Sequence, residues 1–119
     1  MRRIVGSIFQ SLDGVMQAPG GPREDTSGGF ALGGWQMAFT DPVMDDAMQT
    51  LLTPPYALLL GRRTYDIFAS YWPFVDGDDA ALGEAFTNAD KFVLTRGSAP
   101  LAWENSYRLA DIDAVAALK

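Results

Sequence analysis

The stretch ALLLGRRTYD, residues 57–66, decides the fold of this chain. Its first half is an unbroken apolar run, which is typical of a strand buried on both faces of a sheet. Gly61 ends the run and would let a ligand approach the backbone, and the residues after it are typical of a helix. A helix that begins here points free N–H groups and the positive end of its dipole at that place. With Arg62 and Arg63 adding charge, the stretch predicts an anion-binding turn.

Composition excludes several classes of function. The chain has 119 residues, no cysteine and no histidine, which argues against disulfides, thiolate chemistry, a zinc site and a serine–histidine triad. We expect no metal site. A net charge of −6 argues against a broad nucleic-acid surface. No segment is long and apolar enough for a membrane span, so we expect no membrane association. The absence of cysteine is typical of a cytoplasmic protein, and we expect a cytoplasmic location.

Positive charge is nevertheless concentrated locally. Four of the nine basic residues fall in or beside two predicted strand ends, namely Arg62, Arg63, Lys91 and Arg96. Such a spot on an acidic protein suggests a small anionic ligand. The alternative is scattered charge that faces solvent.

Apolar patterns along the chain alternate between strands and helices. Strands are predicted over 3–12, 57–61, 91–95 and, more weakly, 101–109. Helices are predicted from Pro42 to Leu52, after Gly61, around 82–89 and over 112–119. This order predicts an α/β fold with a mainly parallel sheet and helices on both faces. Ligands bind such sheets at the carboxyl ends of strands, where residues 11–14, 61–62 and 95–96 are expected to converge.

Two other segments are candidates for function. Residues 14–34 hold seven of the twelve glycines and form either a flap over a ligand or a surface loop. In the helix that Asp41 and Pro42 begin, helical spacing places Asp45 at the edge of the apolar stripe and Asp46 away from it. Asp45 is either a proton donor whose pKa is raised in an apolar cleft, or a boundary carboxylate in water.

Three short motifs, taken in order, resemble the dihydrofolate reductase fold. They are SLDG at residues 11–14, LGRRTY at 60–65 and FVLTR at 92–96. Within that fold they are most similar to the C-terminal reductase domain of the bifunctional riboflavin-biosynthesis deaminase-reductase, in its stand-alone members. The resemblance covers nearly the whole chain, so residues 1–119 are expected to form a single reductase-like domain.

The resemblance implies NADPH as cofactor. The turn after the second strand would cradle the phosphates, the end of the next strand would hold the adenosine 2′-phosphate, and the SLDG loop would lie beside the nicotinamide. The cofactor-binding residues implied in this way are Leu12, Gly14, Gly61, Arg62, Arg63, Thr64, Leu94, Thr95 and Arg96. In dihydrofolate reductases an acidic residue lies sixteen positions before the motif glycine, which here is Asp45. Asp45 or Asp13 would therefore supply the catalytic proton.

The chain also departs from this family. Its first loop is longer than in folate reductases, and no deaminase domain precedes it. The family continues with a further strand, a glycine-rich turn and a hairpin, none of which follows Lys119, so we expect a C-terminally truncated domain. The open sheet would favour a homodimer. Light scattering that shows a clean monomer would contradict this expectation.

The leading hypothesis is an NADPH-dependent reductase that transfers hydride to a small pyrimidine- or pterin-like heterocycle. Its activity would resemble that of a 5-amino-6-(5-phosphoribosylamino)uracil reductase. One alternative is a nucleotide-binding module without turnover, because fold does not fix function. Another is a fragment that folds only as an oligomer.

Overall fold

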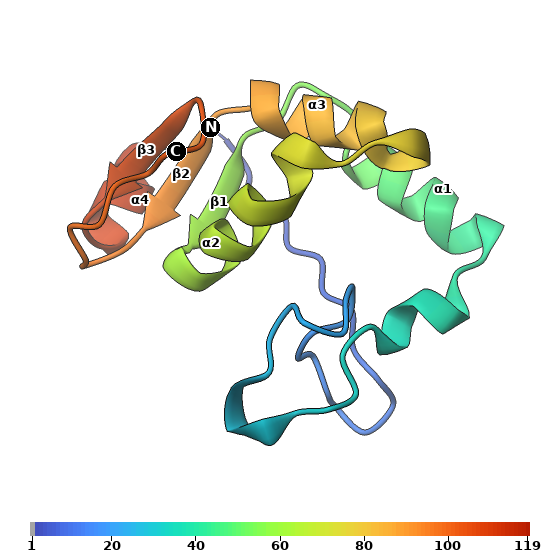
Figure 1. The fold of residues 1–119 in the computed structure, drawn as a ribbon. Coiled ribbons are helices and arrows are strands. Elements are labelled where there is room, and N and C mark those ends of the chain that lie inside the picture. Colours follow the sequence, from blue (N-terminus) through green and yellow to red (C-terminus); the bar gives the residue numbers. More distant parts are fainter. Residues whose placement is uncertain (1) are drawn as a thin grey trace. The chain divides into compact units, whose positions relative to one another are not determined.

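The chain folds into two compact units, which are described in turn (Figure 1). The computed structural model describes residues 2–119. Residues 4–52 form one unit, and residues 53–119 form the other together with residues 2 and 3. The larger unit contains the sheet, and we call it the sheet unit.

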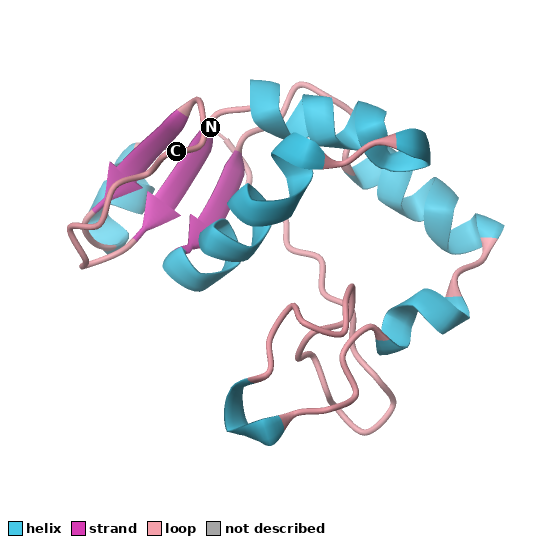
Figure 2. Ribbon diagram, viewed as in Figure 1, coloured by secondary structure: helices cyan, strands magenta, loops and turns pink. Residues whose placement is uncertain are grey.

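The sheet unit is built on three parallel strands in the order β1-β2-β3 (Figure 2). They are β1 (Leu58–Gly61), β2 (Lys91–Leu94) and β3 (Ser106–Leu109). The register aligns Gly61 with Leu94 and Leu94 with Leu109, so the three strands end together. This confirms the predicted α/β class and parallel sheet, although the last strand is shorter than residues 101–109.

Helices connect and cover these strands. α2 (Arg62–Tyr71) and α3 (Ala80–Asn88) lie between β1 and β2 in the chain, joined through the short 3-10 helices η3 (Trp72–Phe74) and η4 (Gly77–Asp79). α4 (Ile112–Ala117) follows β3. Figure 1 shows α2 in front of the sheet and α4 behind it. The segment 95–105 joins β2 to β3 without a helix.

Aromatic side chains hold the 95–105 segment against α2. Tyr65 and Trp103 are both buried, with ring centroids 6.3 Å apart. The Tyr65 hydroxyl accepts a hydrogen bond of 2.9 Å from the Trp103 backbone N–H. The Trp103 indole N–H donates to the Thr87 hydroxyl of α3 at 3.2 Å. Contacts of Trp103 with α2 and α3 thus hold the segment that joins β2 to β3 in place.

Lys91 occupies the opposite end of the sheet from the predicted anion site. Its side chain is fully buried, and its ammonium donates to the carbonyls of Phe86, Thr87 and Ala89 at 2.7, 2.9 and 2.8 Å. The ammonium also lies 4.4 Å from the centre of the Trp103 ring. Including Lys91 in a local basic spot was therefore wrong, because this cation caps the carboxyl end of α3.

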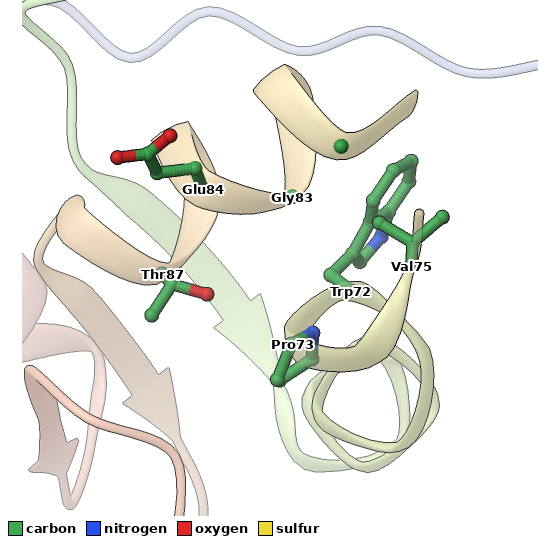
Figure 3. Close-up of a pocket in the computed structure, with 7 residues that line it drawn as sticks. Trp72, Pro73, Val75, Gly83, Glu84 and Thr87 are labelled. Atoms are coloured by element: carbon green, nitrogen blue, oxygen red, sulfur yellow. The ribbon is translucent and has the colours of Figure 1, made fainter. Parts of the chain in front are cut away.

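Gly83 permits a close approach between α3 and η3. A Cβ atom at this position would lie 2.6 Å from the Trp72 carbonyl oxygen and 2.6 Å from the Val75 Cγ1 atom. Figure 3 shows Gly83 on the side of α3 that faces Trp72 and Val75, and all three residues line a small cavity. Glycine is required here because a backbone oxygen stands where a side chain would begin.

We expect Gly83→Ala to lower the free energy of unfolding by about 2 kcal/mol or more, since overpacking costs typically 1–3 kcal/mol. Intrinsic helix propensity alone predicts the opposite sign, a gain of about 1 kcal/mol. Urea unfolding of both proteins measures the difference. Gly6→Ala is the control, because a Cβ at Gly6 would meet nothing within 4 Å. Equal stability of Gly83→Ala and the parent chain would contradict the packing described.

The face of the sheet that carries Leu59, Phe92 and Tyr107 is only partly covered. These three residues are aligned across the strands, and the rings of Phe92 and Tyr107 lie 5.6 Å apart. Leu59 is 42% and Tyr107 49% exposed. The prediction that the 57–61 strand is buried on both faces was wrong. In the sheet that the structure describes, β1 is an edge strand with one covered face.

The smaller unit, residues 4–52, contains α1 (Pro42–Leu51) and two short 3-10 helices, η1 (Ser27–Gly29) and η2 (Trp35–Phe39). The Asp41 carboxylate accepts a hydrogen bond of 2.9 Å from the Met44 N–H, which confirms the predicted helix start. None of the residues of α1 is buried. Apart from η1, residues 14–34 form turns and loops, in which the Gln17 side-chain amide donates to the backbone carbonyls of Asp25 and Ser27.

The prediction of a strand over residues 3–12 was wrong. Within the described residues the segment has no strand assignment, and Ile4, Val5 and Ile8 are exposed. Its residue pattern is that of a strand, but a strand also needs a neighbour that pairs with its backbone groups. Just before this segment, the Arg2 backbone N–H donates to the Lys119 carbonyl oxygen.

Candidate functional site

The carboxyl ends of the three strands bring together two of the three predicted site segments. Residues 61–64 follow β1, and residues 94–96 close β2 beside them, since Gly61 and Leu94 are register partners. The third segment, residues 11–14, belongs to the smaller unit and follows no strand in the described chain. The candidate site is therefore built from the strand ends of the sheet unit.

Gly61 leaves an open space at the start of α2. Its φ of −74° is accessible to any residue, and a Cβ atom here would meet nothing within 4 Å. The chain's own packing thus gives no reason for glycine. No side chain caps the first turn of α2, where Arg63 and Thr64 are exposed. An uncapped helix start with free space before it suits a group that brings its own acceptors.

Arg62 is held by the chain rather than extended into solvent. Its Nε donates to both oxygens of Asp66 at 2.9 and 3.0 Å. One terminal nitrogen donates to the Ala99 carbonyl at 2.9 Å, and the other donates to the Pro100 carbonyl at 3.3 Å. Arg62 therefore links the first turn of α2 to the loop that follows β2.

Arg108 of β3 reaches the same loop. Its two terminal nitrogens donate to the carbonyls of Gly97 and Ala99, the second at 2.6 Å. Because Arg62 and Arg108 share the Ala99 oxygen, their guanidinium groups lie next to each other. Asp66 forms an ion pair with Arg62, and we find no carboxylate paired with Arg108 among residues 2–119. We call Arg62 and Arg108 the arginine pair.

A pocket of about 430 Å³ opens beside the end of β2. Its lining comprises Leu94, Thr95, Arg96, Ala110, Asp111, Ile112 and Asp113. Three of these were predicted to bind the cofactor. The Arg96 side chain is exposed and makes no hydrogen bond or ion pair that we find with the described part of the chain. It is thus available to a ligand in the pocket.

Two carboxylates share this pocket with Arg96. Asp111 accepts a hydrogen bond of 2.8 Å from the Ala114 N–H and so fixes the start of α4, as the sequence predicted. Asp113 lies in the first turn of that helix and is exposed. Carboxylates at a strand end can accept hydrogen bonds from ribose hydroxyls, whereas a guanidinium binds phosphate.

Both candidate proton donors belong to the smaller unit. Asp13 lies in a tight turn in which the Gly14 N–H donates to the Ser11 carbonyl at 3.0 Å, and Gly14 has a φ of +91°. The Asp13 carboxylate accepts a short hydrogen bond from the Ser11 hydroxyl. Leu12, Asp13 and Asp45 are all exposed. The turn at 11–14 is as predicted, and within the described chain neither carboxylate is desolvated.

A second cavity, of about 310 Å³, lies between η3 and α3 (Figure 3). Its walls include Trp72, Pro73, Val75 and Gly83, and the carboxylate of Glu84 points away from Trp72. None of the predicted site residues contributes to it. With few convergent polar groups, it lacks the features of an orienting ligand site.

Residues 2–119 contain no group of acidic residues arranged to hold a metal ion. No helix in this described range has the length and apolarity to cross a membrane. Comparison with protein-family models and with curated proteins finds no match for the chain.

Sequence reasoning did not single out Arg108 and Asp113. The sequence pattern contains a signal for each residue. Alternation along β3 places Arg108 on the face that α2 covers. Asp113 falls in the first turn after the predicted cap Asp111. Neither belongs to a recognisable motif. Only the structure brings them to the strand ends.

Proposed function

We propose that the chain binds NADPH at the carboxyl edge of its sheet and serves as a reductase of a small heterocycle. The observation that carries the proposal is the 430 Å³ pocket with an unpaired Arg96 at the end of β2. It lies at the edge where parallel sheets bind nucleotides. Leu94, Thr95 and Arg96, the segment that the family resemblance assigns to the adenosine phosphate, line it.

The residues at the strand ends fit such a cofactor in two places. Arg96 would bind the 2′-phosphate, and Thr95 would bind the adjoining ribose. The free N–H groups at the start of α2, with Arg63 and Thr64, would bind the pyrophosphate over the open space at Gly61. NADPH, when bound, supplies the hydride of the reaction. The chain's part is to orient the nucleotide and to deliver a proton from Asp45 or Asp13.

A second candidate function is nucleotide binding without turnover. It is favoured by the exposure of Asp13 and Asp45, because a general acid in an oxidoreductase normally works in a site from which water is excluded. Both functions use the same strand ends and differ only in whether the acceptor is reduced.

NADPH fluorescence separates the two functions. We expect saturable enhancement on titration with the protein, followed by loss of the reduced-nicotinamide signal when a pterin or pyrimidine acceptor is added. Asp45→Asn and Asp13→Asn should retain binding, and the variant that lacks the working proton donor should lose turnover by about 100-fold or more. Binding without oxidation across the acceptor panel would favour the second function. Absence of binding would overturn both.

A further inference from the structure

The arginine pair carries more positive charge than its surroundings neutralise. Arg62 has the carboxylate of Asp66, while Arg108 is bonded to the neutral carbonyls of Gly97 and Ala99. Two like charges that share one acceptor repel each other, by roughly 1–4 kcal/mol at the dielectric of a protein surface. An anion bound between the two guanidinium groups would relieve this repulsion.

We propose that Arg62 and Arg108 form an anion site that binds a phosphate or pyrophosphate group, with the 97–100 loop carbonyls holding the two guanidinium groups in its absence. The inference deepens the proposed function, on which it rests for the identity of the phosphate as part of a dinucleotide. The anion chemistry itself rests on the geometry of the pair.

Three observations support the site. First, both guanidinium groups already converge on one oxygen atom, that of Ala99, so a phosphate oxygen in that place would receive hydrogen bonds from both. Second, each group keeps unused donors, because a guanidinium has five N–H bonds and Arg108 uses only its two terminal nitrogens in the bonds that we find within residues 2–119. Third, Arg62 is the first residue of α2, next to the open space at Gly61.

The energies favour exchange of the carbonyls for an anion. A hydrogen bond to a neutral carbonyl near water is weaker than a charge-assisted bond to a phosphate oxygen, and arginine forms such bonds in pairs. The loop carbonyls supply hydrogen-bond acceptors without charge, whereas a phosphate supplies acceptors and negative charge. Residues 97–100 are all exposed, so an anion can reach the pair without unfolding the buried core.

The test uses inorganic pyrophosphate as the probe, with binding measured by calorimetry on the 119-residue chain. We expect Arg108→Met to weaken pyrophosphate by about 10- to 100-fold, the loss of one charge-assisted pair of bonds. Arg108→Lys keeps the charge but not the planar guanidinium, so its pyrophosphate affinity should lie between those of the parent chain and Arg108→Met. Lys119→Met is the matched control, because it removes one exposed cation at the far end of the chain.

A purely structural role for Arg108 makes a different prediction. It would lower the unfolding temperature of Arg108→Met and leave pyrophosphate affinity at the parent value, and that result would overturn the proposal. Pyrophosphate affinity equal in all four proteins would overturn it as well. Repeating the titration with NADPH separates the anion site from the proposed NADPH binding. Pyrophosphate binding that depends on Arg108 without any NADPH binding keeps the anion site and rejects the dinucleotide.

Discussion

Replacing Lys91 by methionine is expected to lower the free energy of unfolding by roughly 3 kcal/mol. Methionine has nearly the same length and can pack against Trp103, so the loss comes from hydrogen bonding. Three carbonyls at the end of α3 lose a shared donor, since the ammonium bonds to Phe86, Thr87 and Ala89 within 2.9 Å. Buried carbonyls left without a partner are costly. Urea unfolding at pH 7 measures the change.

The exposed Lys119 provides the control for this experiment. Lys119→Met removes the same charge without removing a buried donor, so its effect on stability should stay within about 0.5 kcal/mol. Loss of equal size in the two variants would show that net charge, and not the cap on α3, is responsible. An unchanged stability of Lys91→Met would refute the structural role assigned to the cation.

The pH dependence gives an independent check on Lys91. Burial lowers the pKa of its ammonium to about 8, against the opposing influence of Asp90 and Glu104. The folded chain therefore gives up this proton at lower pH than the unfolded chain, whose lysine titrates near 10.5. Between these values the unfolded state binds more protons, so the contribution of Lys91 to stability rises with pH. The stability difference between the parent chain and Lys91→Met should be flat below pH 8 and increase above it.

Much of the sheet unit could be predicted from local sequence. The apolar run at 57–61 and the change to helical spacing after Gly61 placed β1 and α2 correctly, because the type of an element and the start of a helix are local properties. The cap residues Asp41 and Asp111 were identified for the same reason. Each rests on residues within a few positions of one another.

The errors concern properties that depend on distant partners. The pattern of residues 3–12 is that of a strand, but no pattern within the segment says whether a neighbour pairs with it. Lys91 was included in a basic spot because it lies in or beside a predicted strand end. It stands at the amino end of β2, whereas Arg96 follows the carboxyl end of that strand. Arg62 and Arg108 are far apart in the chain and meet only through the Ala99 carbonyl.

Arg96→Ala is expected to lower the affinity for NADPH by about 10- to 100-fold and to leave the affinity for NADH nearly unchanged. Only NADPH carries the 2′-phosphate, and Arg96 is the cation in the pocket at the end of β2. Among residues 2–119 we find no hydrogen bond or ion pair of this guanidinium that its loss would break, so the fold should be unaffected. Fluorescence titrations of both cofactors with the parent and variant chains measure the two affinities.

A carboxylate in the same pocket allows a second test, in which the affinity for NADPH is expected to rise rather than fall. Asp113 lies in the pocket with Arg96, and its negative charge opposes a phosphate there. Asp113→Asn should therefore tighten NADPH by a few-fold and have little effect on NADH. Asp111 is unsuitable for this purpose, because its carboxylate caps α4. Equal losses of NADPH and NADH in Arg96→Ala would place the 2′-phosphate elsewhere. A phosphate bound between these two charges requires that Arg96→Ala lowers the affinity for NADPH and that Asp113→Asn raises it. The affinity for NADH should stay constant in both variants.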